Sequence, residues 1–297
     1  METAIWNSAI VISKLFFYFG FVLAAGYAFF AFSKPWANQS AVKPDIPKLT
    51  ITLVAIALLA NAVWFFATTG LMAEAGLQGA FDSFIVNMMW SAAIGDIALF
   101  RAVGLTMVLL AVMLASVVTL SRLLRGGIQL ILVVAALFLA YSFIQLGHVS
   151  ELGFTNQLLL LFHVLVMAWW FGSLYPLKRA CDALEDEQLI LMMESFGKQA
   201  SVMVVLSVVA GVLLAIELIG SVNALFTTSY GLTLLVKLGL VVSILGIAAR
   251  NKLRLVPAIQ SGEGRALLSQ SIANEMIVAV LILSVTAALT TVVGPEF

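Results

Sequence analysis

The feature that most constrains this chain is a series of apolar runs, each about as long as a membrane is thick. A helix of about twenty apolar residues crosses a hydrocarbon core of about 30 Å. Spanning β-strands would be about half as long and would alternate in polarity, which these runs do not. The runs lie at residues 8–32, 50–70, 96–120, 127–147, 156–177, 198–220, 231–250 and 274–293. We therefore predict an all-α, polytopic membrane protein with eight transmembrane helices.

The composition supports lipid as the solvent. The chain is 63% hydrophobic and 10% charged, which leaves too little polar surface to cover a water-soluble fold of 297 residues. Its formal net charge is zero, and no basic patch points to nucleic acid. The first apolar run is too long for a signal peptide and is expected to remain as a helix. With Cys181 as the one cysteine, no intrachain disulfide is possible.

Lysine and arginine in the loops predict the orientation. Successive loops alternate between the two sides of the membrane, and with eight helices all of the loop cations fall on one side. Cytoplasmic loops are the ones enriched in lysine and arginine. Both termini and both histidines are then expected on the non-cytoplasmic side. The cations are Lys34, Lys43, Lys48, Arg122, Arg125, Lys178, Arg179, Lys198, Arg250, Lys252, Arg254 and Arg265.

A weak internal repeat divides the single membrane domain, residues 1–297, into possible halves 1–148 and 149–297. One triplet of residues recurs at a constant offset of 136, and one glycine pair lies late in the first and fifth runs. We expect two four-helix halves of the same orientation, related by an axis along the membrane normal. Chance similarity between apolar segments is the alternative. The matches are Asn87, Gly95 and Arg101 with Asn223, Gly231 and Lys237, and Gly26 with Gly172.

Two segments outside the runs have the spacing of amphipathic helices. In residues 71–95, large apolar side chains recur at helical intervals, which is typical of a helix in the membrane interface. Residues 182–197 begin with acidic residues and continue with spaced apolar ones, so we expect a cytoplasmic amphipathic helix there. The spaced residues of the first segment are Phe81, Phe84, Ile85, Met88 and Met89.

Ionisable residues inside the runs all map to the outer half of the membrane, and the inner half is predicted to have none. Such residues are costly in lipid and are functional candidates. They predict a polar cavity open to the outside, in which Arg101 and Lys237 are bridged to Asp96 and Glu217. The alternative is that the cations snorkel to the outer headgroups. The residues are Lys14, Asp96, Arg101, His148, His163, Glu217 and Lys237.

The two histidines and nearby methionines are the candidate metal ligands. His148 ends the fourth run, and His163 lies in the fifth, with Met167 one helical turn deeper on the same face. Met88 and Met89 could add thioethers from outside. Imidazole with thioether is a borderline-to-soft set that suits copper, here Cu(I), better than magnesium or calcium. A hydrogen-bonded core histidine and plain apolar packing of the methionines are the alternatives.

Charge argues in the opposite direction. Lys14, Arg101 and Lys237 share the same half of the membrane, and three cations repel a metal ion unless acidic residues neutralise them. No nucleotide-binding loop, zinc-protease motif or dinucleotide fingerprint occurs. We therefore expect neither an enzyme nor ATP-driven transport by this chain alone.

Several stretches of the second half are similar to one known family. They are Gly147-His148, Phe162 to Val164, Met167 to Leu177, Thr228 to Gly231, Leu234 to Leu238, Asn251 to Pro257, Glu275 and Thr286 to Thr290. The chain resembles the copper resistance protein D family; the first half echoes it only at Gly95 to Arg101. The resemblance implies an eight-helix protein of the bacterial inner membrane, associated with moving copper from periplasm to cytoplasm beside a periplasmic copper-binding donor protein. It places the family's histidines at His148 and His163.

Two other functions fit the same residues. In a haem- or quinone-binding redox protein, His148 and His163 would be axial ligands of haem b, and Arg101 or Lys237 would hold propionates or a quinone oxygen. In a docking or sensing partner of a periplasmic copper protein, the histidines would bind without transport.

Overall fold

The computed structural model describes residues 2–30, 45–117, 121–145, 152–261 and 264–293. These residues contain no strand, and eight helices among them are long and apolar enough to cross a membrane. The all-α prediction with eight spans is therefore confirmed. The helices are α1 (Glu2–Phe30), α3 (Asp45–Ala73), α6 (Ala93–Val117), α7 (Arg122–Tyr141), α8 (Phe154–Ala183), α9 (Asp186–Ile219), α11 (Ser229–Arg250) and α12 (Gly264–Leu289).

Two helix boundaries correct the sequence analysis. Residues 186–197 are helical, as expected, but they are the start of α9, which runs unbroken for 34 residues, whereas Asp182 still belongs to α8. Asp186 and Glu187 lie in the first turn of α9, where the helix dipole favours them. The last span begins at Gly264, ten residues before the predicted run, so Glu275 lies well inside it.

Short helices precede the third span of each half. They are α4 (Gly76–Ala80) and α5 (Ser83–Trp90) before α6, and α10 (Val222–Thr227) before α11. The helical part of the expectation for 71–95 is thereby confirmed. Gly95 and Gly231, which match in the repeat, lie where these short helices fold back. A Cβ would stand 1.9 Å from the Trp90 carbonyl oxygen at Gly95 and 2.3 Å from the Ala224 carbonyl oxygen at Gly231. Only glycine fits either position.

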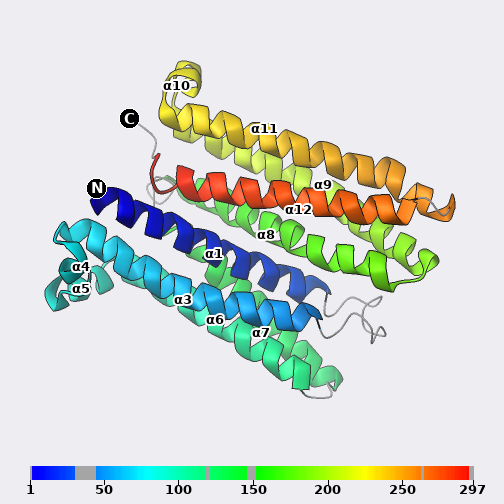
Figure 1. Cartoon of the computed structure of the whole chain (residues 1–297), viewed down its shortest axis with the longest axis horizontal. Coiled ribbons are helices and arrows are strands. Elements are labelled where there is room, and N and C mark those ends of the chain that lie inside the picture. Colours follow the sequence, from blue (N-terminus) through cyan, green and yellow to red (C-terminus); the bar gives the residue numbers. More distant parts are fainter. Residues whose placement is uncertain (1, 31–44, 118–120, 146–151, 262–263, 294–297) are drawn as a thin grey trace.

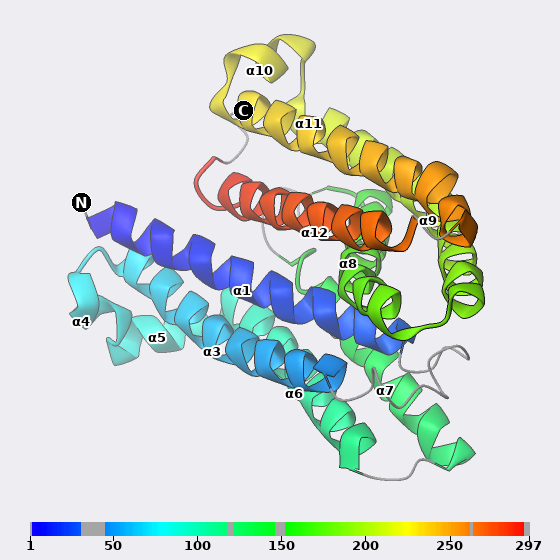
Figure 2. The ribbon, with the colours of Figure 1, turned by 45° about the vertical axis from the view of Figure 1, so that its right-hand side comes forward.

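The eight long helices form two groups of four that meet along α1 and α8 (Figures 1 and 2). The first group is α1, α3, α6 and α7, and the second is α8, α9, α11 and α12. The groups touch chiefly through α1 with α8, α1 with α12, and α7 with α8. If α1 is exchanged with α8 and α7 with α12, the same three contacts result. Two parallel repeats would require this symmetry. The division at residue 148 itself stays a prediction.

After η2 (Asn251–Leu255), a π-helix, and η3 (Pro257–Ser261), a 3-10 helix, the chain enters α12. The bundle therefore has a terminal end, where α1 begins and α12 ends, and an opposite end, where η2 and η3 lie (Figure 1). The short helices α4, α5 and α10 lie at the terminal end (Figure 1).

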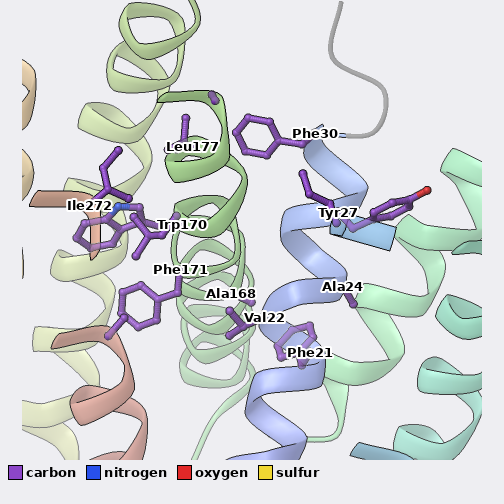
Figure 3. Packing of buried hydrophobic residues seen from close by; sticks show 14 of the residues in the cluster. Phe21, Val22, Ala24, Tyr27, Phe30, Ala168, Trp170, Phe171, Leu177 and Ile272 are labelled. Atoms are coloured by element: carbon purple, nitrogen blue, oxygen red, sulfur yellow. The ribbon is translucent and has the colours of Figure 1, made fainter. Parts of the chain in front are cut away.

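Gly26 and Gly172, the matched glycines, touch each other at the crossing of α1 and α8. A Cβ on Gly26 would lie 2.1 Å from the Gly172 carbonyl oxygen, and one on Gly172 would lie 1.9 Å from the Val22 carbonyl oxygen. Small residues allow this close approach of two backbones in membranes. Apolar side chains of α1 and α8, such as Val22 and Ala168, fill the surrounding space (Figure 3).

Candidate functional site

His163 lies in α8 where this helix packs against α9. Its Nδ1 is 2.8 Å from the backbone carbonyl oxygen of Ser207 and 3.2 Å from the Ser207 Oγ. Since a carbonyl oxygen only accepts, the neutral ring donates from Nδ1 and keeps a lone pair on Nε2. Metal-binding histidines are typically held by such a second hydrogen bond, which fixes the ring and its tautomer.

The backbone of α9 leaves space for this ring only because residue 211 is glycine. A Cβ on Gly211 would lie 2.9 Å from Cε1 of His163 and 3.1 Å from its Nδ1. One turn deeper in α8, the half-buried Met167 packs against the main apolar core. His163 and Met167 therefore share one face of α8, as predicted from their spacing.

Lys237 in α11 is close enough to His163 to interact with it electrostatically. The first half contains a related arrangement. Phe17 precedes Gly26 by the same nine residues that separate His163 from Gly172, and Arg101, the repeat partner of Lys237, places its guanidinium carbon 4.2 Å from the Phe17 ring centroid. In each half, a cation of the third helix thus interacts with a ring of the first helix, Arg101 with Phe17 by direct contact and Lys237 with His163 electrostatically.

Lys14 and Arg101 point into the protein, so they do not snorkel to the headgroups. Lys14 is 6% exposed, and its Nζ donates to the Thr290 carbonyl oxygen at 2.9 Å, just after the end of α12. A cation is favourable there because of the helix dipole. Arg101 is 4% exposed, lies over Phe17 and Trp64, and donates from Nε to Ser142 Oγ at 3.2 Å.

The expected bridges from Arg101 and Lys237 to Asp96 and Glu217 are wrong. Both carboxylates are exposed, and the ion pairs within the described residues involve neither of them. Asp96 and Arg101 are five residues apart, which places them about 140° apart around the helix axis. The described residues therefore offer no carboxylate that neutralises the buried cations.

The remaining candidate ligands are separated from His163 or lie outside the described residues. Met89 is 3% exposed and packs in an apolar cluster with Trp64 and Ile97, whereas Met88 is 48% exposed. Their helix, α5, packs against α3 and α6, away from the contact of His163 with α9. His148 lies outside the residues that the structure describes. No group of three histidine, cysteine, aspartate or glutamate side chains among the described residues is arranged to hold a metal.

Glu275, which the sequence analysis named only for the family resemblance, is a buried polar residue of α12. It is 4% exposed, and its Oε1 accepts a hydrogen bond of 2.5 Å from Asn251 Nδ2. Glu275 lies inside α12, so it belongs with the ionisable residues of the spans, among which the sequence analysis did not count it. The helical spacing of Leu268 and Ile272 ahead of Glu275 could have extended this helix upstream, but the polar residues between them kept that segment out of the hydropathy run.

The comparisons with known proteins agree with this architecture. Residues 1–154 match the family described as copper resistance protein D-like, N-terminal domain, and residues 190–289 match copper resistance protein D. The fold is that of a multi-pass, all-helical membrane protein, and the matched families are those of copper resistance and homeostasis. The chain belongs to the copper resistance protein D family. No curated protein and no solved structure matches it.

The matches divide the candidate residues. His163 and Met167 lie between the two matched ranges, whereas Asn251 and Glu275 lie within the second one. Family membership therefore supports copper handling by the chain as a whole, and the assignment of His163 rests on the geometry of α8 and α9.

Proposed function

We propose that this protein imports copper, as Cu(I), across the bacterial inner membrane from periplasm to cytoplasm. The observation that carries the proposal is the hydrogen bond from His163 Nδ1 to the Ser207 carbonyl oxygen. It leaves Nε2 for a metal, with the Met167 thioether one turn deeper. Imidazole and thioether are donors that suit copper.

The orientation follows from charge. The cationic residues at the start of α7 and the end of α8, Arg122, Arg125, Lys178 and Arg179, lie at the opposite end of the bundle from the termini. By the positive-inside rule that end is cytoplasmic, and both termini are periplasmic. Nine residues separate Phe154 from His163, so His163 is about 14 Å below the periplasmic start of α8. A periplasmic copper-binding protein is the proposed donor, with His148 as the entry ligand.

Replacing His163 by alanine tests the assignment. We expect the Cu(I) affinity of the purified protein to fall at least about 100-fold. Loss of a group that only hydrogen-bonds to a metal ligand lowers metal affinity by about 10–100-fold, and loss of the ligand itself should cost more. Copper accumulation in cells should fall to the level of cells lacking the protein. Titration against a competing chelator and whole-cell copper analysis give the two readouts. Unchanged affinity would remove His163 from the site, and binding without accumulation would favour a docking or sensing role.

Lys237 provides a prediction of opposite sign. Its charge opposes a cation bound at His163, and no carboxylate among the described residues pairs with it. Lys237→Met keeps most of the side-chain volume and removes the charge, so we expect Cu(I) to bind about tenfold more tightly. Lys198→Met, an exposed cation near the opposite end, is the control and should leave the affinity unchanged. Weaker binding in Lys237→Met would contradict the electrostatic argument.

A further inference from the structure

A cavity of about 380 Å³ lies inside the second group of helices, toward the opposite end of the bundle from the termini. Residues of α8, α9, α11 and α12 line it, and most are apolar, including Trp170, Leu174, Met193, Val204 and Leu245. Trp170 follows Met167 closely on α8, and Leu174 is one turn further. One helix therefore leads from His163 to this cavity.

The buried pair of Asn251 and Glu275 forms the polar part of the cavity wall. Both residues are less than a tenth exposed, and the carboxylate and the amide share one hydrogen bond. Asn251 Oδ1 is buried and has no hydrogen-bond partner among the described residues. No lysine or arginine of the described residues forms an ion pair with Glu275. With Glu275 ionised, the pair has more acceptors than donors, and a buried acceptor without a partner is costly.

The backbone at Asn251 is also unusual. Asn251 is the first residue of the π-helix η2, and its carbonyl oxygen accepts from Val256 N at 2.9 Å, five residues ahead. π-helical turns are rare and occur frequently at functional sites. Here the π-helix carries Asn251 into the cavity wall and the next residue, Lys252, to the surface.

Lys252 connects η2 to α9 at the exposed edge of the same cavity. Its Nζ donates to Ser201 Oγ at 2.5 Å, and its aliphatic carbons lie near Gly197. Lys252 and Ser201 both line the cavity and are exposed, so the cavity reaches the surface beside them.

We infer that Glu275 and Asn251 form an inner station for the copper ion, on the cytoplasmic side of the His163 site; this inference rests on the proposed function. The carboxylate and the amide oxygen supply the acceptors, and the Met193 thioether lines the same cavity. Oxygen is a harder donor than imidazole or thioether, so the station holds Cu(I) more weakly than His163 does. A permeation route needs sites that an ion can leave, and this order of affinities favours release inward.

Glu275→Gln tests the station, with Glu217→Gln as the matched control because Glu217 is an exposed carboxylate of α9. Titration of the purified full-length protein with Cu(I) should show one tightly bound equivalent of Cu(I), which depends on His163, and a second equivalent that binds more weakly. In Glu275→Gln the weaker equivalent should lose affinity at least tenfold while the tight one is retained. Copper uptake into proteoliposomes should fall at least tenfold. Glu217→Gln should change neither readout.

A second variant separates this inference from folding effects and from the proposed function. Asn251→Leu removes the amide oxygen and keeps the carboxylate, and it should lose the same weaker equivalent. The melting temperature shows which of the two variants folds like the wild type. If such a variant keeps both the weaker Cu(I) equivalent and copper uptake, the inner station is overturned and import by His163 still stands. Absence of both His163-dependent binding and uptake in the wild-type protein would overturn the proposed function itself.

Discussion

Replacing Gly172 by alanine is expected to destabilise the protein by about 3 kcal/mol or more. One added methyl group in a packed interior usually costs 1–3 kcal/mol when side chains can adjust. Here the new Cβ would stand 1.9 Å from the Val22 carbonyl oxygen and 2.7 Å from the Gly26 backbone nitrogen. Backbone atoms of α1 cannot rotate away, so the two groups of helices must separate along this crossing.

Thermal unfolding of the purified protein in detergent, followed by circular dichroism, measures this effect. Gly239→Ala is the matched control, because Gly239 lies inside α11 and a Cβ there would meet nothing within 4 Å. Alanine is the better helix former by about 1 kcal/mol, so the control should be as stable as the wild type or slightly more stable. Equal melting temperatures for Gly172→Ala and Gly239→Ala would show that α1 and α8 do not meet as described.

The sequence alone predicted the long helices because lipid imposes their length and apolar character. It also paired Gly26 with Gly172 and Gly95 with Gly231, but only as repeated letters. The physical reason for these glycines is a close approach between backbones, and such contacts depend on which helices are neighbours. Hydropathy gives the number of helices and leaves their neighbours open.

The candidate site shows the same division. Helical spacing predicted that His163 and Met167 share a face, because that relation is local. The partner of His163, the Ser207 carbonyl oxygen, belongs to another helix and leaves no mark in the sequence, since every residue has a carbonyl. The predicted pairing of Arg101 with Asp96 failed because two residues at a similar depth of one helix can still point in different directions around its axis. Polar residues at the start of α12 shortened the predicted run to 274–293, which placed Glu275 at its very edge rather than near the middle of the helix.

Replacing Arg265 by methionine is expected to destabilise the protein by about 2 kcal/mol. The Arg265 guanidinium donates to the carbonyl oxygens of Cys181 at 2.8 Å and Leu184 at 2.7 Å, and to Asp186 Oδ1 at 2.5 Å. It thus joins the start of α12 to the end of α8 and the first turn of α9. Carbonyls at a helix end lack partners within the helix, and charged donors to such groups contribute 1.5–3 kcal/mol. The exposed ion pair with Asp186 adds little.

The same melting experiment separates geometry from charge at this position. Arg265→Lys keeps the charge but loses the planar fork that reaches two carbonyls and a carboxylate at once, so it should recover less than half of the loss. Arg254→Met removes an exposed arginine of η2 and should leave the melting temperature unchanged. If lysine restored full stability, charge at the end of α8 would be sufficient and the fork unnecessary. If Arg265→Met melted at the wild-type temperature, apolar contacts alone would hold the junction of α8, α9 and α12. The buried Leu184, Leu189 and Leu268 belong to the apolar core there.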